Sequence, residues 1–144
     1  NTVKMVVLGP LLDLAGFYHK PFRIETEPSV TLEMQDEETI IRGRIDVLVL
    51  KNRLWLLVIE SKRSDFAVTR AIPQALAYML GNPHPEKPAL GFVTNGIDFI
   101  FLKLTKQGMP KYAESYSFTL RNEDGLYTVL KVLKRFAQLF RERE

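Results

Sequence analysis

The sequence contains no cysteine, which excludes disulfide bonds and thiolate metal sites. The absence fits the reducing cytoplasm, the location that we expect. Histidine is scarce too: His19 and His84 stand alone, and neither has a second ligand at the spacing of a zinc site. No hydrophobic run approaches the ~20 residues of a membrane-spanning helix, so no membrane association is expected.

Phosphate-binding loops and nucleophile motifs are also missing. There is no glycine-rich loop of the Walker type, which excludes an NTP-driven motor within this chain. Ser61, Ser64 and Thr69 lack both a nearby base and the sharp turn that exposes a nucleophilic serine. Any catalysis therefore has to come from carboxylates and cations.

The composition is that of an ordinary globular domain. The 144 residues are 46% hydrophobic and 26% charged, with a net charge of +3. A chain of this length buries roughly 68–70% of its unfolded surface, which suffices for one core. We therefore expect residues 1–144 to form a single domain.

Charge is distributed unevenly along the chain. Residues 25–38 are acidic, whereas residues 42–70 are rich in lysine and arginine. The basic stretch surrounds Asp46 and Glu60, as a nuclease requires, because cations must hold a polyanion beside carboxylates that would repel it. The alternative is that these cations only solubilise strand ends and loops.

Hydrophobic periodicity predicts an α/β fold with the element order αβββαβ, followed by further strands and a C-terminal helix. Helices are predicted over 3–16, 68–80 and 124–141, the first of them ending at Gly16. Pro10 either kinks the first helix or begins its second half.

Strands are predicted over 24–34, with a bend at Pro28, and over 40–50 and 54–61, which would form an antiparallel hairpin. Residues 35–38 are expected to form a polar turn. The almost continuous hydrophobicity of the hairpin predicts a mixed central sheet with helices on both faces. Further strands are expected at 90–93, 97–104 and 112–120, the first two joined by an Asn-Gly turn.

Two acidic residues lie in strands that otherwise have the composition of buried strands. Asp46 falls within the run IDVLVL, and Glu60 closes the run LWLLVIE fourteen residues later. Lys62 follows Glu60 by two positions, so on a strand both side chains point to the same face. A neighbouring strand could place Asp46 beside them. Two carboxylates and an ammonium on one face would be costly without a partner, and a metal ion is such a partner.

This cluster suits the hydrolysis of a phosphodiester bond. Mg²⁺ prefers carboxylate, carbonyl and water oxygens, so Asp46, Glu60 and the backbone carbonyl of Ser61 could bind it, with Mn²⁺ as a substitute. Lys62 would orient or deprotonate the attacking water and offset charge on the phosphate. The alternative is structural, because a Glu-x-Lys pair is common on protein surfaces and need be no more than an ion pair.

Four short segments carry a family resemblance. In chain order they are GRID at 43–46, VIESK at 58–62, QALAY at 74–78 and TNG at 94–96. Together they resemble the PD-(D/E)XK nuclease superfamily and, more narrowly, the N-terminal nuclease domain of type I restriction enzyme R subunits. The resemblance spans residues 2–104 and implies a restriction-endonuclease-like αβββαβ core.

The resemblance also implies roles for particular residues. Asp46 and Glu60 would bind Mg²⁺, and Lys62 would be catalytic. Gln74 and Tyr78 match a Gln-x-x-x-Tyr element shared with the nuclease domains of bacterial recombination helicases. At i and i+4 they share one helix face, where they would touch DNA or position the acids. The alternative is a helix surface pair with no special role.

Two positions depart from the pattern of this superfamily. The proline that often precedes the first aspartate is replaced by Ile45. The acid that many members place on the first helix should be a glutamate, and the chain offers only Asp13 there. Asp13 has a shorter reach, and the alternative for it is an exposed helix residue.

The sequence thus predicts a Mg²⁺-dependent DNA endonuclease that acts through Asp46, Glu60 and Lys62. The competing hypothesis keeps the fold without the activity, as a nucleic-acid-binding or assembly module that needs a partner. The absence of a motor or sequence-recognition domain favours a partner such as a helicase/translocase or another restriction subunit. A homodimer would supply the two sites that double-strand cleavage needs.

Overall fold

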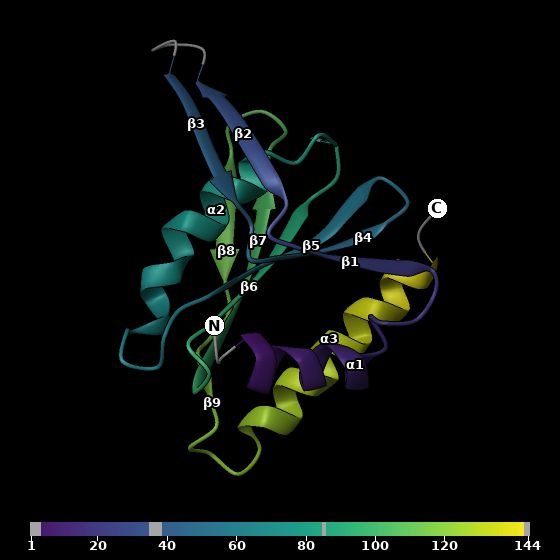
Figure 1. The fold of residues 1–144 in the computed structure, drawn as a ribbon, viewed down its shortest axis with the longest axis vertical. Helices are drawn as coiled ribbons and strands as arrows, with labels where there is room; N and C mark the ends of the chain where they lie inside the picture. Colours follow the sequence, from purple (N-terminus) through teal and green to yellow (C-terminus); the bar gives the residue numbers. More distant parts are fainter. Residues whose placement is uncertain (1–3, 35–38, 85, 143–144) are drawn as a thin grey trace.

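The computed structural model of the protein has three layers (Figure 1). A central β-sheet carries helix α2 (Ile72–Leu80) on one face, and helices α1 (Gly9–Ala15) and α3 (Gly125–Glu142) on the other. The expectation of a mixed α/β fold with helices on both faces of the sheet and a C-terminal helix is therefore confirmed. The structure describes residues 4–34, 39–84 and 86–142.

The central sheet contains both antiparallel and parallel pairs. In spatial order its strands are β1 (Phe22–Thr26), β4 (Val47–Lys51), β5 (Leu54–Ser61), β6 (Ala89–Thr94), β7 (Asp98–Thr105) and β8 (Lys111–Glu114), and β9 (Phe118–Thr119) also pairs with β7. Strands β5 and β6 run parallel, and their other neighbours in this sheet run antiparallel. A parallel pair needs a long crossover, which α2 provides.

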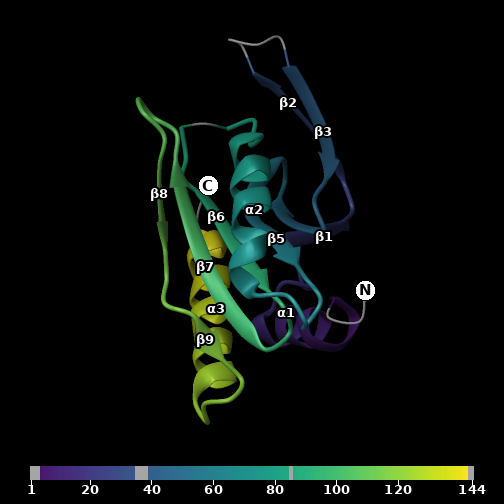
Figure 2. The same ribbon diagram turned by 90° about the vertical axis from the view of Figure 1, so that its left-hand side faces the viewer.

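The strand predicted over 24–34 is wrong, because the chain forms two strands in different sheets. Strand β1 joins the central sheet, whereas β2 (Ser29–Met34) pairs with β3 (Thr39–Arg44) in a separate two-stranded arm. The break falls at Glu27, whose φ of 56° is left-handed, and at Pro28. The arm extends beyond the central sheet in both views (Figures 1 and 2).

The strand predicted over 40–50 is likewise two strands, β3 and β4, with Ile45 and Asp46 between them. The two breaks bond to each other. The Glu27 N–H donates to the Asp46 carbonyl (3.1 Å), and the Ile45 N–H donates to the Pro28 carbonyl (3.1 Å). The three consecutive strands of the αβββαβ core are thus β1, β4 and β5, with the arm inserted between β1 and β4. The turn predicted over 35–38 lies outside the described residues.

The predicted helices form, with local departures at their N-termini. A π-helical turn, Lys4–Leu8, precedes α1, and Gly16 ends that helix with a φ of 96°. Pro10 lies in the first turn of α1, so it begins the second half of the segment. The 3₁₀ turn Val68–Ala71 precedes α2. The strand predicted over 112–120 is two short strands, β8 and β9.

Strand β5 shows how the two faces of the sheet are divided. Its alternating residues Leu57 and Ile59 belong to the core beneath α1 and α3, whereas Val58 belongs to the core beneath α2. By the same alternation Glu60 lies on the α2 face. The hydrophobic pattern of the strand therefore decides that the acidic residue lies on the side of α2.

Candidate active site

Asp46 and Glu60 meet where strand β4 begins and strand β5 ends. These strands are antiparallel, and Val47 lies opposite Ile59, so the residue before β4 neighbours the last residues of β5. Glu60 is almost completely buried, with 2% of its surface exposed, and Asp46 is half-buried. The two acids that the sequence singled out are thus adjacent in space.

Each carboxylate accepts hydrogen bonds from the other strand. The Asp46 N–H donates to Glu60 Oε2 (3.0 Å). The Ser61 N–H donates to Asp46 Oδ2 (2.9 Å), and the Ser61 hydroxyl donates to the same oxygen (3.2 Å). The Ser61 bonds hold the Asp46 carboxylate and the Asp46 N–H holds the Glu60 carboxyl group, so both groups have a fixed position before any ligand arrives.

The pKa of Glu60 is raised from its ordinary value of 4.5 to about 8. Burial is the largest cause, since it disfavours the charged form, and the neighbouring Asp46 carboxylate adds to it. The hydrogen bond from the Asp46 N–H and the Lys62 ammonium act in the opposite direction. A buried acid whose pKa is raised by burial and by a neighbouring carboxylate is a candidate functional residue.

Lys62 follows directly after β5 and is connected to α2. Its N–H donates to the Thr94 carbonyl (2.9 Å), one bond beyond the β5–β6 pairing. Its Nζ donates to Gln74 Oε1 (3.3 Å), and Gln74 Nε2 donates to the Tyr78 hydroxyl (2.9 Å). The predicted i, i+4 pair therefore forms a chain of hydrogen bonds that ends at the lysine.

A scan against known families supports the assignment made from the four sequence segments. The family described as "Type I restriction enzyme R protein N terminus" matches residues 7–108 of the chain. The chain belongs to this family. The predicted resemblance to the N-terminal domain of these R subunits is thereby confirmed.

One solved structure shares the fold of this family member. It is the fragment structure of a protein described as an HsdR subunit of a type I restriction enzyme from Vibrio vulnificus YJ016. The TM-score is 0.52 and the sequence identity 22%, with 91% of this chain and 25% of that chain covered. The chain thus spans about a quarter of the length of the Vibrio chain. No curated protein matches the sequence.

The donor set of this R-protein N-terminal domain fits a magnesium ion. Asp46, Glu60 and the Ser61 carbonyl offer oxygen ligands, and Mg²⁺ is held in proteins by one or two carboxylates together with water and substrate oxygens. A cation there would also compensate two neighbouring carboxylates, one of which is buried.

Asp13 does not join this cluster. It is exposed on α1, whose buried residues pack into the core on the other face of the sheet. Within residues 4–34, 39–84 and 86–142, no group of three or more histidine, aspartate or glutamate side chains could hold a metal ion. The described side chains therefore supply two acids to the candidate site, and Asp13 is not a third.

Gly43 and Asn95 lie in two of the four sequence segments, but no role was predicted for either residue from the sequence. Gly43 lies against the Tyr78 ring, and a Cβ at this position would collide with the Tyr78 hydroxyl. The available signal was a glycine inside a strand, which often marks close approach of another group. Asn95 is 4% exposed and donates through Nδ2 to the Phe66 carbonyl (2.8 Å), so the turn after β6 supports the segment after Lys62.

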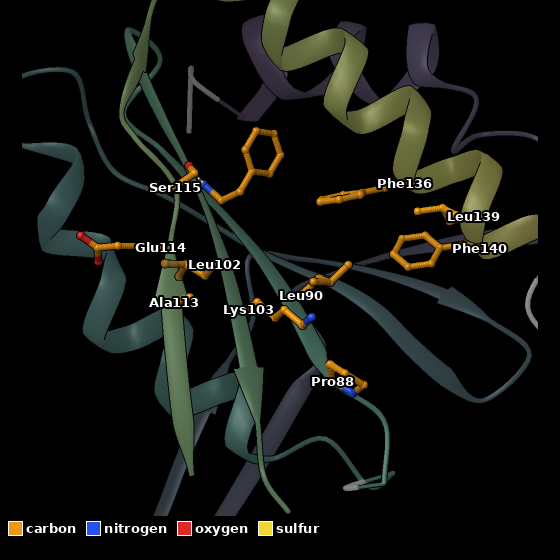
Figure 3. Close-up of a pocket in the computed structure, with 11 residues that line it drawn as sticks. Pro88, Leu90, Leu102, Lys103, Ala113, Glu114, Ser115, Phe136, Leu139 and Phe140 are labelled. Carbon is orange, nitrogen blue, oxygen red and sulfur yellow. Dashed lines mark hydrogen bonds between the residues drawn. The ribbon is translucent and has the colours of Figure 1, made fainter.

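The molecule also has a hollow that is separate from the candidate active site. Its volume is about 460 Å³, and its lining includes Leu90, Phe136 and Phe140 (Figure 3). It lies between the sheet and α3 and contains none of the candidate site residues. Among the described residues, no helix has both the length and the hydrophobicity of a membrane span.

Proposed function

We propose that this R-protein N-terminal domain hydrolyses phosphodiester bonds of DNA with the help of Mg²⁺. The observation that carries the proposal is the pair of hydrogen bonds between the start of β4 and the end of β5: the Asp46 N–H donates to Glu60 Oε2, and the Ser61 N–H donates to Asp46 Oδ2. Lys62 follows directly in the sequence. This arrangement supports a preorganised anionic site next to one cation, which is what phosphodiester cleavage requires.

Asp46, Glu60 and the Ser61 carbonyl would hold the metal. When bound, Mg²⁺ acts as a Lewis acid on the phosphate and lowers the pKa of water. The protein contributes the positions of these oxygens. Because Ser61 donates two hydrogen bonds to Asp46 Oδ2, the aspartate cannot swing away from the site without losing both. Binding of a cation would also shift Glu60 towards its ionised form.

Lys62 would orient the attacking water and offset the charge that develops on the phosphate. An ammonium on a flexible stem needs support if it is to hold one position, since its rotamer entropy is large. Gln74 supplies that support through Oε1, and Tyr78 fixes the opposite end of the amide. In this proposal Gln74 and Tyr78 are positioning residues, and Lys62 is the catalytic one.

The wider assignment is also a proposal. The Vibrio chain that shares the fold is about four times longer, since the match covers 25% of it. We therefore propose that this domain works in the cytoplasm beside a helicase/translocase region or another restriction subunit, with DNA as substrate. Cleavage of both strands would need two such domains, which a homodimer would provide.

Cleavage of supercoiled plasmid tests the proposal directly. Wild type and Lys62→Ala, purified identically, are compared with Mg²⁺, with Mn²⁺ and with EDTA. We expect metal-dependent nicking by wild type and a loss of about 10³-fold or more in Lys62→Ala, within the range for a catalytic group and its electrostatic contribution. Equal nicking by both proteins would reject the role of Lys62.

A catalytically silent module is the second candidate, favoured by the lack of a third acid among the described residues. Calorimetric titration with Mg²⁺ separates the two candidates without needing turnover. The nuclease proposal expects a binding heat in wild type that disappears in Asp46→Asn, since that change removes one anionic ligand. Silence in both proteins would support the binding or assembly module.

A further inference from the structure

The segment that follows Lys62 gathers cations around one aromatic ring. The guanidinium carbons of Arg63 and Arg70 lie 5.0 and 4.9 Å from the centre of the Phe66 ring. Both distances fall within the ~6 Å of a cation–π contact. Two arginines from either side of Phe66 in the sequence are thus brought together next to the candidate catalytic lysine.

The protein neutralises these cations only in part. Asp65 accepts a hydrogen bond from Arg63 (3.2 Å). Lys62 and Arg70, in contrast, form no salt bridge with any residue that the structure describes, although the Lys62 ammonium acts electrostatically on Glu60. Arg63 and Arg70 lie over one ring, and Lys62 lines the same hollow as Arg70, so positive charge is gathered here, and like charges repel one another. An anion bound between them would relieve the repulsion.

A hollow of about 160 Å³ lies at this place and is lined by Lys62, Phe66 and Arg70. One of the lining residues is fixed to the turn after β6, because the Phe66 carbonyl accepts a hydrogen bond from the buried Asn95 (2.8 Å). Asn95 is itself fixed, since its Oδ1 accepts from the N–H groups of Ile97 and Asp98. Hydrogen bonds therefore fix the backbone at Phe66, and the cations Lys62 and Arg70 line the hollow on either side of it in the sequence.

We propose that this hollow binds a backbone phosphate of DNA next to the phosphodiester attacked at Asp46 and Glu60. The inference rests on the proposed function, since it assumes DNA as the substrate. Guanidinium groups suit phosphate because their planar fork donates two parallel hydrogen bonds. Contact with Phe66 limits the rotamers of both arginines, so less entropy is lost when they bind. Lys62 belongs to both the hollow and the candidate site. It would therefore fix which phosphate of the DNA strand lies at the acidic pair when a neighbouring phosphate occupies the hollow.

Binding of a short fluorescent duplex DNA in EDTA, over a series of salt concentrations, tests this inference. The variant Arg63→Gln/Arg70→Gln removes the two guanidinium groups. Lys131→Gln/Arg135→Gln is the matched control, since it removes two exposed cations of α3, one of them over the Tyr127 ring. Circular dichroism establishes that both variants are folded.

We expect the site variant to bind about ten-fold more weakly, with a slope of log affinity against log salt reduced by roughly one to two. The control should change affinity less than about two-fold. An equal loss in both variants, an unchanged slope in the site variant, or no duplex binding by wild type would each overturn the inference.

Two further results keep this inference distinct from the nuclease proposal. Binding in EDTA does not require cleavage, so a site-specific loss of affinity in a protein that never nicks plasmid would support the hollow and reject the nuclease. Plasmid nicking by wild type with unaltered DNA binding by the site variant would do the reverse. Phe66→Leu keeps both charges, so it should lower affinity about three-fold at an unchanged salt slope; full affinity would reject the role of the ring.

Discussion

The two faces of the central sheet are built from the same strands but are filled differently. On the α1/α3 face, Phe92 stacks with Phe99 and Phe101 at ring distances of 5.8 and 4.9 Å, and Phe136 meets Phe101 edge to face at 5.6 Å. On the α2 face, the core gives way at the ends of β4 and β5 to the Asp46–Glu60 pair.

The difference teaches where this fold places chemistry. A strand that alternates its side chains can give one face entirely to packing while the last residue on the other face carries an acid. Leu57 and Ile59 contribute to the core under α3, and Glu60 lies at the boundary of the core under α2. In the proposed function, stability and chemistry therefore depend on different residues of one strand, and single substitutions should separate them.

Phe92→Ala should have the largest effect on the packed face. Phe92 is fully buried, and loss of a buried ring leaves a cavity, so we expect the free energy of unfolding to fall by about 4 kcal/mol. Urea denaturation measures the change. Tyr112→Ala, at a residue with 57% exposure on β8, is the control and should lose less than about 1 kcal/mol. Similar losses in the two variants would contradict the assignment.

Glu60→Gln should stabilise the metal-free protein above about pH 4.5. In wild type, folding at such a pH requires Glu60 to take up a proton that the unfolded chain has released, and this uptake costs free energy. Between pH 4.5 and 8 the unfolded glutamate is ionised while folded Glu60 keeps its proton, since its pKa is raised to about 8. The free energy of unfolding of wild type therefore falls as pH rises through this window. A glutamine cannot titrate, so the variant escapes that loss.

Urea denaturation in EDTA should find the two proteins similar near pH 4.5, and the variant more stable by on the order of 3 kcal/mol near pH 8. Glu114→Gln, an exposed residue of β8, should show no such divergence. A Glu60→Gln variant that loses stability with pH as steeply as wild type would contradict the raised pKa.

Tyr78→Phe should have the smallest effect on stability and a clear effect on cleavage. The change removes the hydroxyl that accepts from Gln74, a bond worth about 1 kcal/mol. Without it the Gln74 amide can rotate, and Lys62 loses its oriented partner. We expect a few-fold to ten-fold loss of nicking rate, with Tyr112→Phe unchanged. Normal nicking by Tyr78→Phe would show that the chain from Tyr78 to Lys62 does not position the lysine.

Much of this fold could be predicted because its determinants are local. The strands β5, β6 and β7 consist largely of apolar residues, and the helices have clear periodicity. The adjacency of Asp46 and Glu60 could be predicted for a related reason. An acid next to an apolar strand stands out in the sequence. When the two strands that carry Asp46 and Glu60 pair with each other, these acids and Lys62 have few possible arrangements.

The two strand breaks could not be predicted from the sequence. A glutamate with positive φ at residue 27 is unusual, and Ile45-Asp46 has the composition of a continuing strand. Each break is stabilised by the other through bonds between residues far apart in the chain. The same holds for Asp13, since only the packing of α1 shows on which face of the sheet it lies.

The junction between the arm and the sheet lies directly beside the candidate site. Strands β2 and β3 form the two-stranded arm. The arm is joined to the sheet by two hydrogen bonds, one between Glu27 and Asp46 and one between Ile45 and Pro28. The Asp46 carbonyl accepts one of these two bonds, and the Asp46 N–H donates to the Glu60 side chain. The backbone of Asp46 thus connects the arm directly to the acidic pair, with its carbonyl bonded to the arm junction and its N–H bonded to Glu60.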